Sequence, residues 1–339
     1  MDEKLVFNLL IAARGYRATI QSVDPENGDF SVSLKKQAAI KDLPDNRKAT
    51  GIVVDEKGEP VFGAQVYITG AKQGDRKWWG QVRNIDKVAI TDKDGKFVLT
   101  SDADFEQWQF SVYAAGFVKS SSDHLPTGDH NHKFKLDPGC TVTGTVKKNG
   151  KPVAGLRIGM CQKDRSGINW VGEKIISTDK NGQFMFNSVL ANDTFYVYAK
   201  MTGPKKKHTI EIAEFDSVKT GKTKALGDFD LLPTFSCEGQ VVLLDEDGKE
   251  LRDPEAISLD GQKMFVNRKY AWDHQVIKLK PDGFFAIECL PQEPVKIAVR
   301  VPGYVYSKTK NQFQLTGENE MGKLIEGDIK DLKIYLEPK

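Results

Sequence analysis

The chain has few cysteines, no long apolar run and almost no net charge. Four cysteines among 339 residues are too few for a disulfide-rich scaffold, and none stands in a Cys-x-x-Cys pattern that would favour a zinc site. The longest apolar run, Leu9 to Ala13, falls far short of the ~20 residues that cross a bilayer. Membrane spans and zinc fingers are therefore not expected in this chain.

Charge and hydrophobicity narrow the class of protein further. Lys and Arg number 49 against 47 Asp and Glu, a formal net charge of +2, so the chain as a whole has no field that would attract nucleic acid or an anionic membrane. Hydrophobic residues make up 39% of the sequence, which is enough to bury cores. A chain of this length is predicted to form two to four domains.

What is present is a set of motifs repeated along the chain. Gly51, Gly144 and Gly239 each open a copy with the pattern Gly-x-Val, and they stand 93 and 95 residues apart. Each copy then has a hairpin signal, Asp-Gly or Asn-Gly, close before a phenylalanine. These signals are Asp94-Gly95, Asn181-Gly182 and Asp282-Gly283. Two nearly equal periods indicate that the same small module is built three times.

A third element closes the copies with an apolar strand and then a glycine before an aromatic residue, as at Gly116-Phe117 and Gly303-Tyr304. Phe7 to Tyr16 lines up with this element, and Phe30 to Leu34 with the final strand that follows it. Residues 1–38 are therefore predicted to be the C-terminal half of a truncated repeat, in a fragment of a longer protein. The alternative, a signal peptide, is disfavoured by acidic residues in its first positions.

Strands that arrive every ~8–12 residues, with turn signals between them, predict an all-β fold. We expect tandem Ig-like or transthyretin-like seven-stranded β-sandwiches at 47–138, 139–233 and 235–338, the last of them divergent. The short linkers favour a rod of domains over independent beads. In the first complete copy the predicted core comprises Ile52, Val54, Val66, Ile68, Ile90, Phe97, Leu99, Phe110, Val112 and Tyr113.

The first complete copy reads x-Gly-x-Val-x-Asp-x-x-Gly-x-Pro-Val-x-Gly-Ala-x-Val from Thr50 to Val66, followed by Thr-Asp-x-Asp-Gly-x-Phe from Thr91 to Phe97. This string resembles the carboxypeptidase regulatory-like domain, which belongs to the transthyretin-like (prealbumin-like) β-sandwiches. The match is good in the second complete copy and degenerate in the third, where the Pro-Val pair is missing. The resemblance implies spacer, adhesion or substrate-presenting roles in bacterial cell-envelope or secreted proteins, and hence an extracytoplasmic location.

Enzymes that use related sandwiches need residues that this sequence does not have. Transthyretin-like hydrolases end in Tyr-Arg-Gly-Ser, whereas this chain ends in Tyr335-Leu336-Glu337-Pro338-Lys339. Intradiol dioxygenases bind iron through two tyrosines and two histidines, and this sequence does not have these ligands in the required arrangement. The sequence contains no carboxypeptidase zinc motif, nucleophile elbow or phosphate-binding glycine loop. It therefore predicts a protein that is not an enzyme and that uses no cofactor.

The densest polar cluster is Asp123-His124 followed by Asp129-His130-Asn131-His132. Side chains two residues apart on an extended strand point the same way. His130 and His132, with His124 and Asp129, are therefore a candidate metal site. The interpretation that we favour is a solvated loop without a metal, because the other copies have nothing equivalent.

Four tryptophans lie between the second strand of their copy and its turn glycine: Trp78, Trp79, Trp170 and Trp272. Polar residues flank each of them, and an exposed aromatic ring beside polar groups can stack a sugar ring. These four are the candidate ligand-binding residues. The interpretation that we favour is that each tryptophan covers the edge of its own sandwich or packs at the junction with the next domain.

Two cysteine pairs, Cys140 with Cys161 and Cys237 with Cys289, fall within one copy each, so disulfides are open to consideration. Their positions are not equivalent between the copies, and buried thiols are the favoured interpretation.

We therefore expect a structural spacer or adhesion arm whose partners are other domains of the same longer protein. One alternative is a carbohydrate- or glycopeptide-binding module, with a polysaccharide or a surface protein as its partner. The other alternative is the accessory region of an enzyme whose catalytic domain lies outside this chain.

Overall fold

The computed structural model describes residues 7–13, 16–24, 26, 28–36, 40–80, 82–166, 170–201, 207–251, 258–311, 314–317 and 320–339. Their regular structure is almost entirely β-strand, with two short 3-10 helices, η2 (Ile40–Asp42) and η3 (Asp45–Arg47). The predicted all-β sandwich fold is confirmed. Neither of these helices is long and apolar enough to cross a bilayer.

The first complete sandwich is named sandwich A. Its strands are β3 (Lys48–Val54), β4 (Gln65–Gln73), β5 (Arg76–Trp79), β6 (Ala89–Ile90), β7 (Lys96–Thr100), β8 (Gln107–Tyr113), β9 (Ser120–Pro126) and β10 (Gly128–Lys135). One sheet has the order β10–β3–β7, and the other has the order β5–β4–β8–β9 with β6 also on β4. Because β5 and β6 pair with different parts of the same strand, the two sheets have seven strand positions.

The second complete sandwich is named sandwich B. Its strands are β11 (Cys140–Lys148), β12 (Lys151–Pro152), β13 (Arg157–Gln162), β14 (Lys174–Ser177), β15 (Gln183–Val189), β16 (Thr194–Ala199), β18 (Ala213–Asp216) and β19 (Thr223–Asp230). In its first sheet β11 lies between β15 and β19, with β12 at the end of β11, and the second sheet has the order β14–β13–β16–β18. Two short strands, β17 (His208–Thr209) and β20 (Leu232–Pro233), pair with each other beside it.

The third complete sandwich is named sandwich C. Its strands are β21 (Phe235–Leu243), β22 (Lys263–Arg268), β23 (His274–Lys278), β24 (Phe284–Leu290), β25 (Pro294–Arg300), β26 (Tyr304–Tyr306), β27 (Gln314–Gly317), β28 (Glu320–Leu324) and β29 (Ile329–Pro338). The sheet orders are β24–β21–β29–β26 and β23–β22–β25–β28–β27. In all three sandwiches the first strand runs antiparallel to the strand after the Asp-Gly or Asn-Gly turn and parallel to the last strand.

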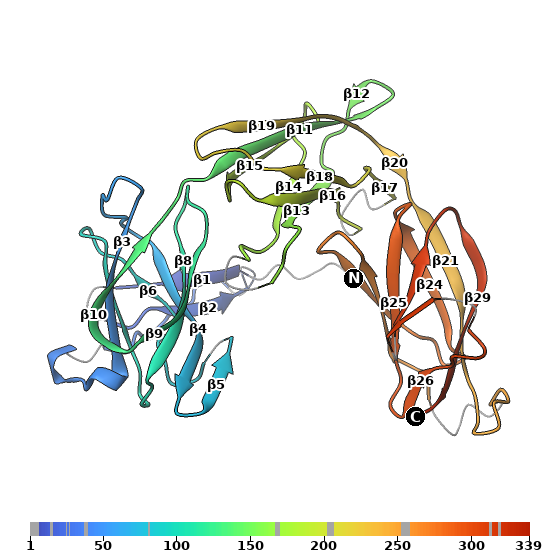
Figure 1. Cartoon of the computed structure of the whole chain (residues 1–339), viewed down its shortest axis with the longest axis horizontal. Helices are drawn as coiled ribbons and strands as arrows, with labels where there is room; N and C mark the ends of the chain where they lie inside the picture. The colour runs from blue at the N-terminus through green and yellow to red at the C-terminus, as the bar shows by residue number, and fades with distance from the viewer. Residues whose placement is uncertain are drawn as a thin grey trace.

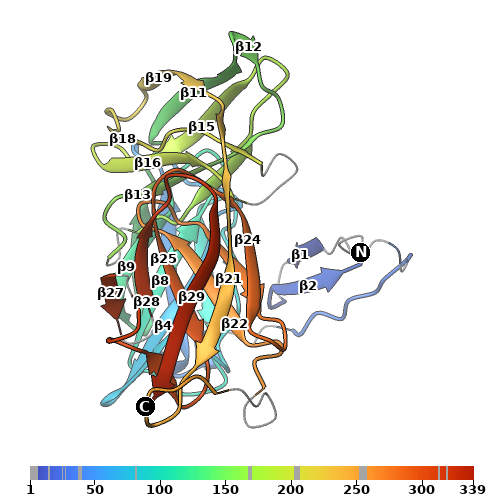
Figure 2. The same ribbon diagram turned by 90° about the vertical axis from the view of Figure 1, so that its right-hand side faces the viewer.

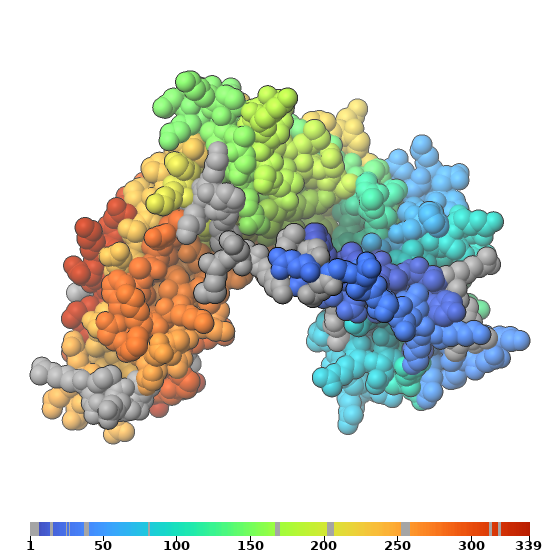
Figure 3. Space-filling model, turned by 180° about the vertical axis from the view of Figure 1, so that it is seen from behind, coloured from blue at the N-terminus to red at the C-terminus, as the bar shows by residue number. Residues whose placement is uncertain are grey.

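The three sandwiches form an arch, with sandwich B at the top and sandwiches A and C on either side of it (Figure 1). The linkers are short, as expected, but the chain bends at both joints instead of forming a straight rod. An N-terminal hairpin of β1 (Phe7–Ile11) and β2 (Thr19–Val23) projects from one side of the arch (Figure 2). From behind, the N-terminal segment lies against sandwich A (Figure 3).

The repeated glycine of each first strand lies directly opposite the repeated phenylalanine. Gly51 pairs with Phe97, Gly144 with Phe184 and Gly239 with Phe285. A Cβ on any of these glycines would overlap that aromatic ring, and on Gly51 also the carbonyl oxygen of His132. The period near 95 residues therefore reflects one packing contact, in which an aromatic ring occupies the space beside a glycine.

A buried threonine ties two loops together in sandwiches A and B. The Thr91 hydroxyl accepts the N–H of Ala64 at 2.8 Å and donates to the carbonyl of Val61 at 2.6 Å. Thr178 makes the same two bonds in sandwich B. Sandwich C has Leu279 at this place in the motif and also lacks the Pro-Val pair. The threonine and the Pro-Val pair are absent together from sandwich C. This fits their contact in the other two sandwiches, where the threonine hydroxyl binds the loop that contains the Pro-Val pair.

Each complete sandwich has its own apolar core. In sandwich A most of the predicted core is buried, but Tyr113 is 42% exposed and Ile52 and Ile90 are half-buried. Tyr113 directly follows the buried Val112 on β8, and successive side chains on a strand point to opposite faces. The prediction was wrong at Tyr113 because apolar character does not identify the inward side of a strand.

All four cysteines are buried thiols, in agreement with the favoured interpretation. Cys140 lies on β11 and Cys161 on β13, in the two different sheets of sandwich B. Burial raises the pKa of Cys237 to about 11. The thiols therefore behave as core residues rather than reactive groups.

One expected strand is not formed. Phe30 to Leu34 is extended but pairs with no strand among the described residues. It is held to the hairpin by the N–H of Arg17, which donates to the carbonyl of Lys35 at 2.8 Å, and by a bridge between Tyr16 and Lys36. In sandwich A the matching strand, β10, is paired with β3, and the described residues between 7 and 36 contain no such first strand.

The glycine–aromatic contact gives a direct test of the repeat. Gly51→Ala places a methyl group into the Phe97 ring and a backbone carbonyl, so we expect the free energy of unfolding of sandwich A to fall by about 1–3 kcal/mol. Urea unfolding followed by tryptophan fluorescence measures this. Gly327→Ala is the control, because nothing lies within 4 Å of its added Cβ. Equal stability of the two variants would contradict the packing argument.

Candidate functional site

Trp170 of sandwich B and Trp272 of sandwich C meet at the joint between the two sandwiches. Their ring centroids are 5.4 Å apart, with 51° between the planes. The guanidinium of Arg165 lies 5.7 Å from the Trp272 ring centroid. The backbone N–H of Trp272 donates to the Tyr198 hydroxyl at 3.1 Å. These two of the four candidate tryptophans are therefore engaged in contacts between domains.

The other two candidate tryptophans are neighbours on β5 and differ in environment. Trp78 is half-buried and packs edge-on against Phe105 of the core, with ring centroids 5.8 Å apart. Trp79 points the other way and is 68% exposed, with its ring 5.6 Å from that of His124. Alternation along the strand explains the difference. Trp79 is the candidate whose ring is largely open to solvent.

The candidate metal ligands lie on β9 and β10, and three of them have polar partners; the ring of the fourth, His130, lies 5.8 Å from that of His132. His124 Nδ1 lies 3.2 Å from the carboxylate of Asp123. The Asp129 carboxylate accepts a hydrogen bond from Thr50, and His132 Nε2 lies 2.8 Å from the carbonyl of Pro126. In the part of the chain that the structure describes, no three His, Cys, Asp or Glu side chains form a group that could hold a metal ion.

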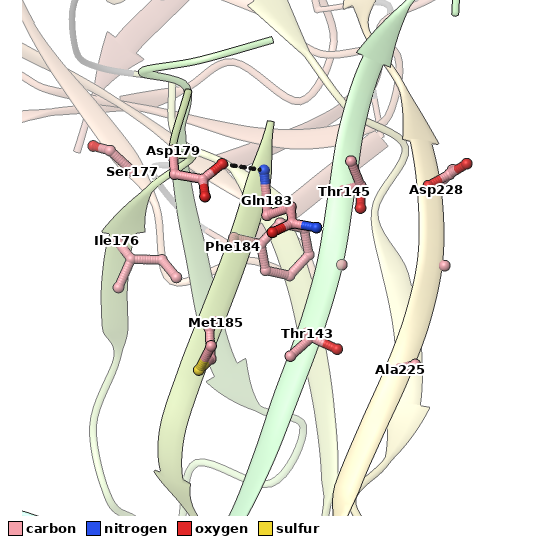
Figure 4. Close-up of a pocket in the computed structure, with 12 residues that line it drawn as sticks. Thr143, Thr145, Ile176, Ser177, Asp179, Gln183, Phe184, Met185, Ala225 and Asp228 are labelled. Atoms are coloured by element: carbon pink, nitrogen blue, oxygen red, sulfur yellow. Dashed lines mark hydrogen bonds between the residues drawn. The ribbon is translucent and has the colours of Figure 1, made fainter. Parts of the chain in front are cut away.

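Sandwich B has a surface groove of about 510 Å³. It crosses the outer side of the β19–β11–β15 sheet and is lined by short side chains such as Thr143, Thr145 and Ala225, with Met185 and Asp228 at its sides (Figure 4). Asp179 accepts a hydrogen bond from the backbone N–H of Gln183 at 2.8 Å, so this carboxylate is engaged in its own turn. The groove has no cluster of titratable groups that would carry out chemistry.

The joint between sandwiches B and C contains a buried network of charged residues. Lys200 follows β16 and is almost fully buried. Its Nζ lies 2.9 Å from Glu173 Oε1 and 3.0 Å from Asp273 Oδ1, and it donates to the carbonyl of Trp272 at 3.1 Å. The lysine of one sandwich is thus bound by a carboxylate and a carbonyl of the other.

Arg268 of sandwich C makes the reciprocal contact. Its guanidinium binds both oxygens of Glu293, at 2.6 and 2.7 Å, and donates to the carbonyl of Ala199 in sandwich B at 2.5 Å. Its side chain is completely buried. Burial opposes the charged form, but Glu293, Asp273 and Tyr198 together outweigh it, so that the pKa of Arg268 is raised. A two-pronged, charge-assisted pair of this kind fixes orientation as well as distance.

Asp273 joins the two cations. Its carboxylate lies between Lys200 and Arg268 and also accepts the backbone N–H of Met201 at 2.7 Å. The Met201 side chain is part of the core of sandwich C, although it follows the last residues of β16. Met201, which continues the chain of sandwich B, therefore packs into the core of sandwich C beside the Asp273 carboxylate.

Tyr198 completes the joint. Its hydroxyl donates to Glu173 and accepts from the backbone of Trp272, and its ring lies 5.1 Å from the Arg268 guanidinium. Burial raises the pKa of Tyr198 far above its usual range. The hydroxyl therefore stays protonated at neutral pH and serves as a hydrogen-bonding group, not as an acid or base.

Trp170 also contacts sandwich A. Its carbonyl accepts a hydrogen bond from Lys119 Nζ of sandwich A at 3.1 Å, while its ring packs on Trp272 of sandwich C. Burial lowers the pKa of Lys119. Trp170 thus contacts both neighbouring sandwiches.

The sequence reasoning missed the charged residues of this joint. A signal was present in β22, where Met264, Val266 and Arg268 alternate on one side and are all buried. A cation that continues an inward-facing series is a candidate for a buried ion pair. Trp108 was also missed, although it is fully buried at the centre of sandwich A.

Comparisons with known proteins show no family. No protein-family model matches the chain, and no curated protein matches it. Among solved structures, a streptococcal ancillary pilin is 12% identical over 86% of this chain and 99% of its own, with a TM-score of 0.30. The Bacillus anthracis TIE protein is 14% identical over 99% of this chain and 58% of its own, with a TM-score of 0.23.

A third solved structure, the minor pilin GBS52 of Streptococcus agalactiae, is 13% identical over 59% of this chain and 96% of its own, with a TM-score of 0.27. Values this low carry no argument about family or function. The resemblance to carboxypeptidase regulatory-like domains therefore stays a prediction from sequence.

The joint should depend on its buried charges. In Lys200→Met the Glu173 and Asp273 carboxylates keep their burial but lose their shared cation, and we expect the unfolding free energy of the joined sandwiches to fall by about 3–5 kcal/mol. Calorimetry measures this loss. Lys163→Met is the matched control, because Lys163 pairs with Glu214 in the same sandwich on the exposed surface, where such pairs contribute little. A loss no larger than that of the control would show that the network does not hold the joint.

Proposed function

We propose that the chain is a non-enzymatic structural arm of a larger cell-envelope or secreted protein. Its task is to hold neighbouring domains at a fixed separation and angle. The observation that carries the proposal is the buried network of Lys200, Asp273 and Arg268 at the joint between sandwiches B and C. A flexible linker would suffice if the relative position of the two sandwiches did not matter.

The physical support is the cost of opening this joint. Moving sandwich C away from sandwich B would part Lys200 from Asp273 and uncover Met201, which packs in the core of sandwich C. Breaking a buried ion pair leaves uncompensated charge, so the closed geometry is strongly preferred. The titratable groups at the joint bind one another across the interface. This favours a mechanical role for them over a catalytic one.

The units of the arm are the domains 47–138, 139–233 and 235–338, each with its own hydrophobic core. The extracytoplasmic location and the partners, which are further domains of the same protein, follow from the resemblance to carboxypeptidase regulatory-like repeats. An arm of this kind also suits the accessory region of an enzyme whose catalytic domain lies elsewhere.

A rigid arm predicts a narrow distribution of distances between sandwiches B and C. Spin labels at Lys180→Cys and Lys308→Cys, both exposed positions, report this distance by pulsed electron paramagnetic resonance, because the native thiols are buried. Lys200→Met should broaden the distribution, and Lys163→Met should leave it unchanged. A broad distribution with the native joint would refute the structural-arm proposal.

A second candidate function is carbohydrate or glycopeptide binding through Trp79. The observation that favours it is a 68% exposed indole ring on sandwich A. Stacking of a sugar on this ring would bury apolar area that is now in water. Trp170 and Trp272 support this function less, because they pack against each other.

Tryptophan fluorescence tests the second candidate. Addition of a set of cell-wall polysaccharides should shift the emission of the native chain, and Trp79→Ala should abolish the shift. Trp78→Phe is the comparison on the same strand, because its half-buried ring packs on Phe105 instead. If no polysaccharide changes the spectrum, Trp79 is an ordinary surface residue.

A further inference from the structure

The N-terminal hairpin is built like one particular hairpin of a complete sandwich. Next to the turn β1 pairs with β2 in the same register as β8 with β9, because the matching partners stand eight residues apart in both; farther from the turn β8–β9 has a register shift, between Gln109 and Ser111, that β1–β2 lacks. These matching pairs are Ile11 with Thr19 and Val112 with Ser120. The turn also carries the same backbone bond, from Tyr16 N–H to Ala13 at 3.1 Å and from Phe117 N–H to Ala114 at 3.2 Å.

The chain that follows the hairpin matches as well. The N–H of Arg17 donates to the carbonyl of Lys35, and in sandwich A the N–H of Val118 donates to the carbonyl of Asp137, both at 2.8 Å. Residues 30–34 therefore occupy the place of the end of β10. The described N-terminal residues contain the counterparts of β8, β9 and β10, which are the back half of a sandwich.

The partners of these strands are missing among the described residues. β8 pairs on its other edge with β4, and β10 runs parallel to β3. β1 pairs with β2 alone, and residues 30–34 have no strand beside them. The free edge of β1 and the backbone of residues 30–34 therefore have no strand at the places where β4 and β3 lie in sandwich A.

The apolar side chains show the same deficit. Phe7 is 48% exposed and Leu9 is 37% exposed. Their counterparts by alignment on the glycine of the turn are buried in both sandwiches A and C: Trp108 and Phe110, and Val295 and Ile297. An isolated two-stranded hairpin with an uncovered apolar face is marginal in water. Phe7 and Leu9 thus have the residue types of a sandwich core, but no opposite sheet among the described residues covers them.

Sandwich A does not cover this face. It holds the hairpin through charges: Arg17 lies 3.2 Å from Asp86 and 3.0 Å from Asp102, and Lys35 lies 3.4 Å from Asp102. The hydrogen bond from Arg17 lowers the pKa of Asp102. Figure 2 shows β1 and β2 standing away from the sandwiches. The attachment fixes the segment while its apolar face stays open.

We propose that residues 7–11, 16–23 and 30–36 are an acceptor for the front half of a sandwich of this same type, supplied from outside residues 1–339. The incoming polypeptide adds one strand antiparallel to β1, as β4 does to β8, and one parallel to residues 30–34, as β3 does to β10. Its chemistry is that of β3 and β4: a Gly-x-Val strand and an apolar strand with alternating buried side chains. Strand addition of this kind gains backbone hydrogen bonds and apolar burial together.

The experiment supplies a front half of known sequence. Residues 47–101 of this chain, which contain β3 to β7, are fused ahead of residue 1 of the full chain. We expect the backbone amides of residues 7–11 and 30–34 to exchange with solvent about tenfold or more slowly than in the unfused chain. If the fusion does not fold, a free peptide with the sequence Gln65–Gln73 should slow exchange in β1 of the unfused chain.

Two substitutions separate docking from unspecific protection. Leu9→Asp puts a charge on the apolar face, so it should abolish the protection in the fusion and leave the melting temperature of the unfused chain unchanged. Asn8→Asp changes the opposite side of β1 and keeps the acceptor for the Ser22 hydroxyl, so protection should persist. Fast exchange in both the fusion and the peptide mixture would overturn the proposal. The proposal would also be overturned if the unfused chain formed dimers and Leu9→Asp made them dissociate, because the acceptor would then bind a second copy of the chain.

Discussion

The arrangement of sandwiches B and C depends on one buried carboxylate, Asp273. It binds Lys200 of sandwich B and lies beside Arg268 of its own sandwich. It also accepts a hydrogen bond from the backbone N–H of Met201. Each of these groups would be costly to bury alone, and the interface is where all of them find partners. The packed indoles of Trp170 and Trp272, tilted by 51° to each other, lie beside this network, and Lys119 links Trp170 to sandwich A. The bend of the arch is thus built from contacts that only exist when the sandwiches are joined.

Inside each sandwich, a different and local constraint repeats. A glycine on the first strand leaves room for the phenylalanine after the turn, and a threonine hydroxyl ties that turn to the Pro-Val loop. Sandwich C keeps the glycine contact but has Leu279 where the others have threonine, and it keeps the same strand pairing. The ring over the glycine is therefore the part of the motif that goes with the fold, and the threonine bond is an addition to it.

The tryptophans show why a recurring residue need not have a recurring role. Trp78 and Trp79 are adjacent in sequence, yet one packs on Phe105 and the other is 68% exposed, because strand residues alternate between faces. Trp170 and Trp272 have similar places in their copies and meet each other because the joint between sandwiches B and C brings them together. The N-terminal segment gives the opposite lesson, since its register next to the turn matches that of β8 and β9 while the described residues contain no partners for it.

The sequence alone determined the module, its period and the identity of the turn residues, because tight turns and close backbone approach demand glycine at particular positions. It also indicated the half-repeat at residues 1–38 through the alignment of Phe7 to Tyr16. Only the tertiary structure decided which apolar residues face inward at Tyr113 and Ile52, that the chain bends into an arch, and that Lys200, Asp273 and Arg268 meet. The reason is physical: ion pairs between domains join residues about 70 positions apart, and no local pattern specifies a distance that the packing of two separate cores creates.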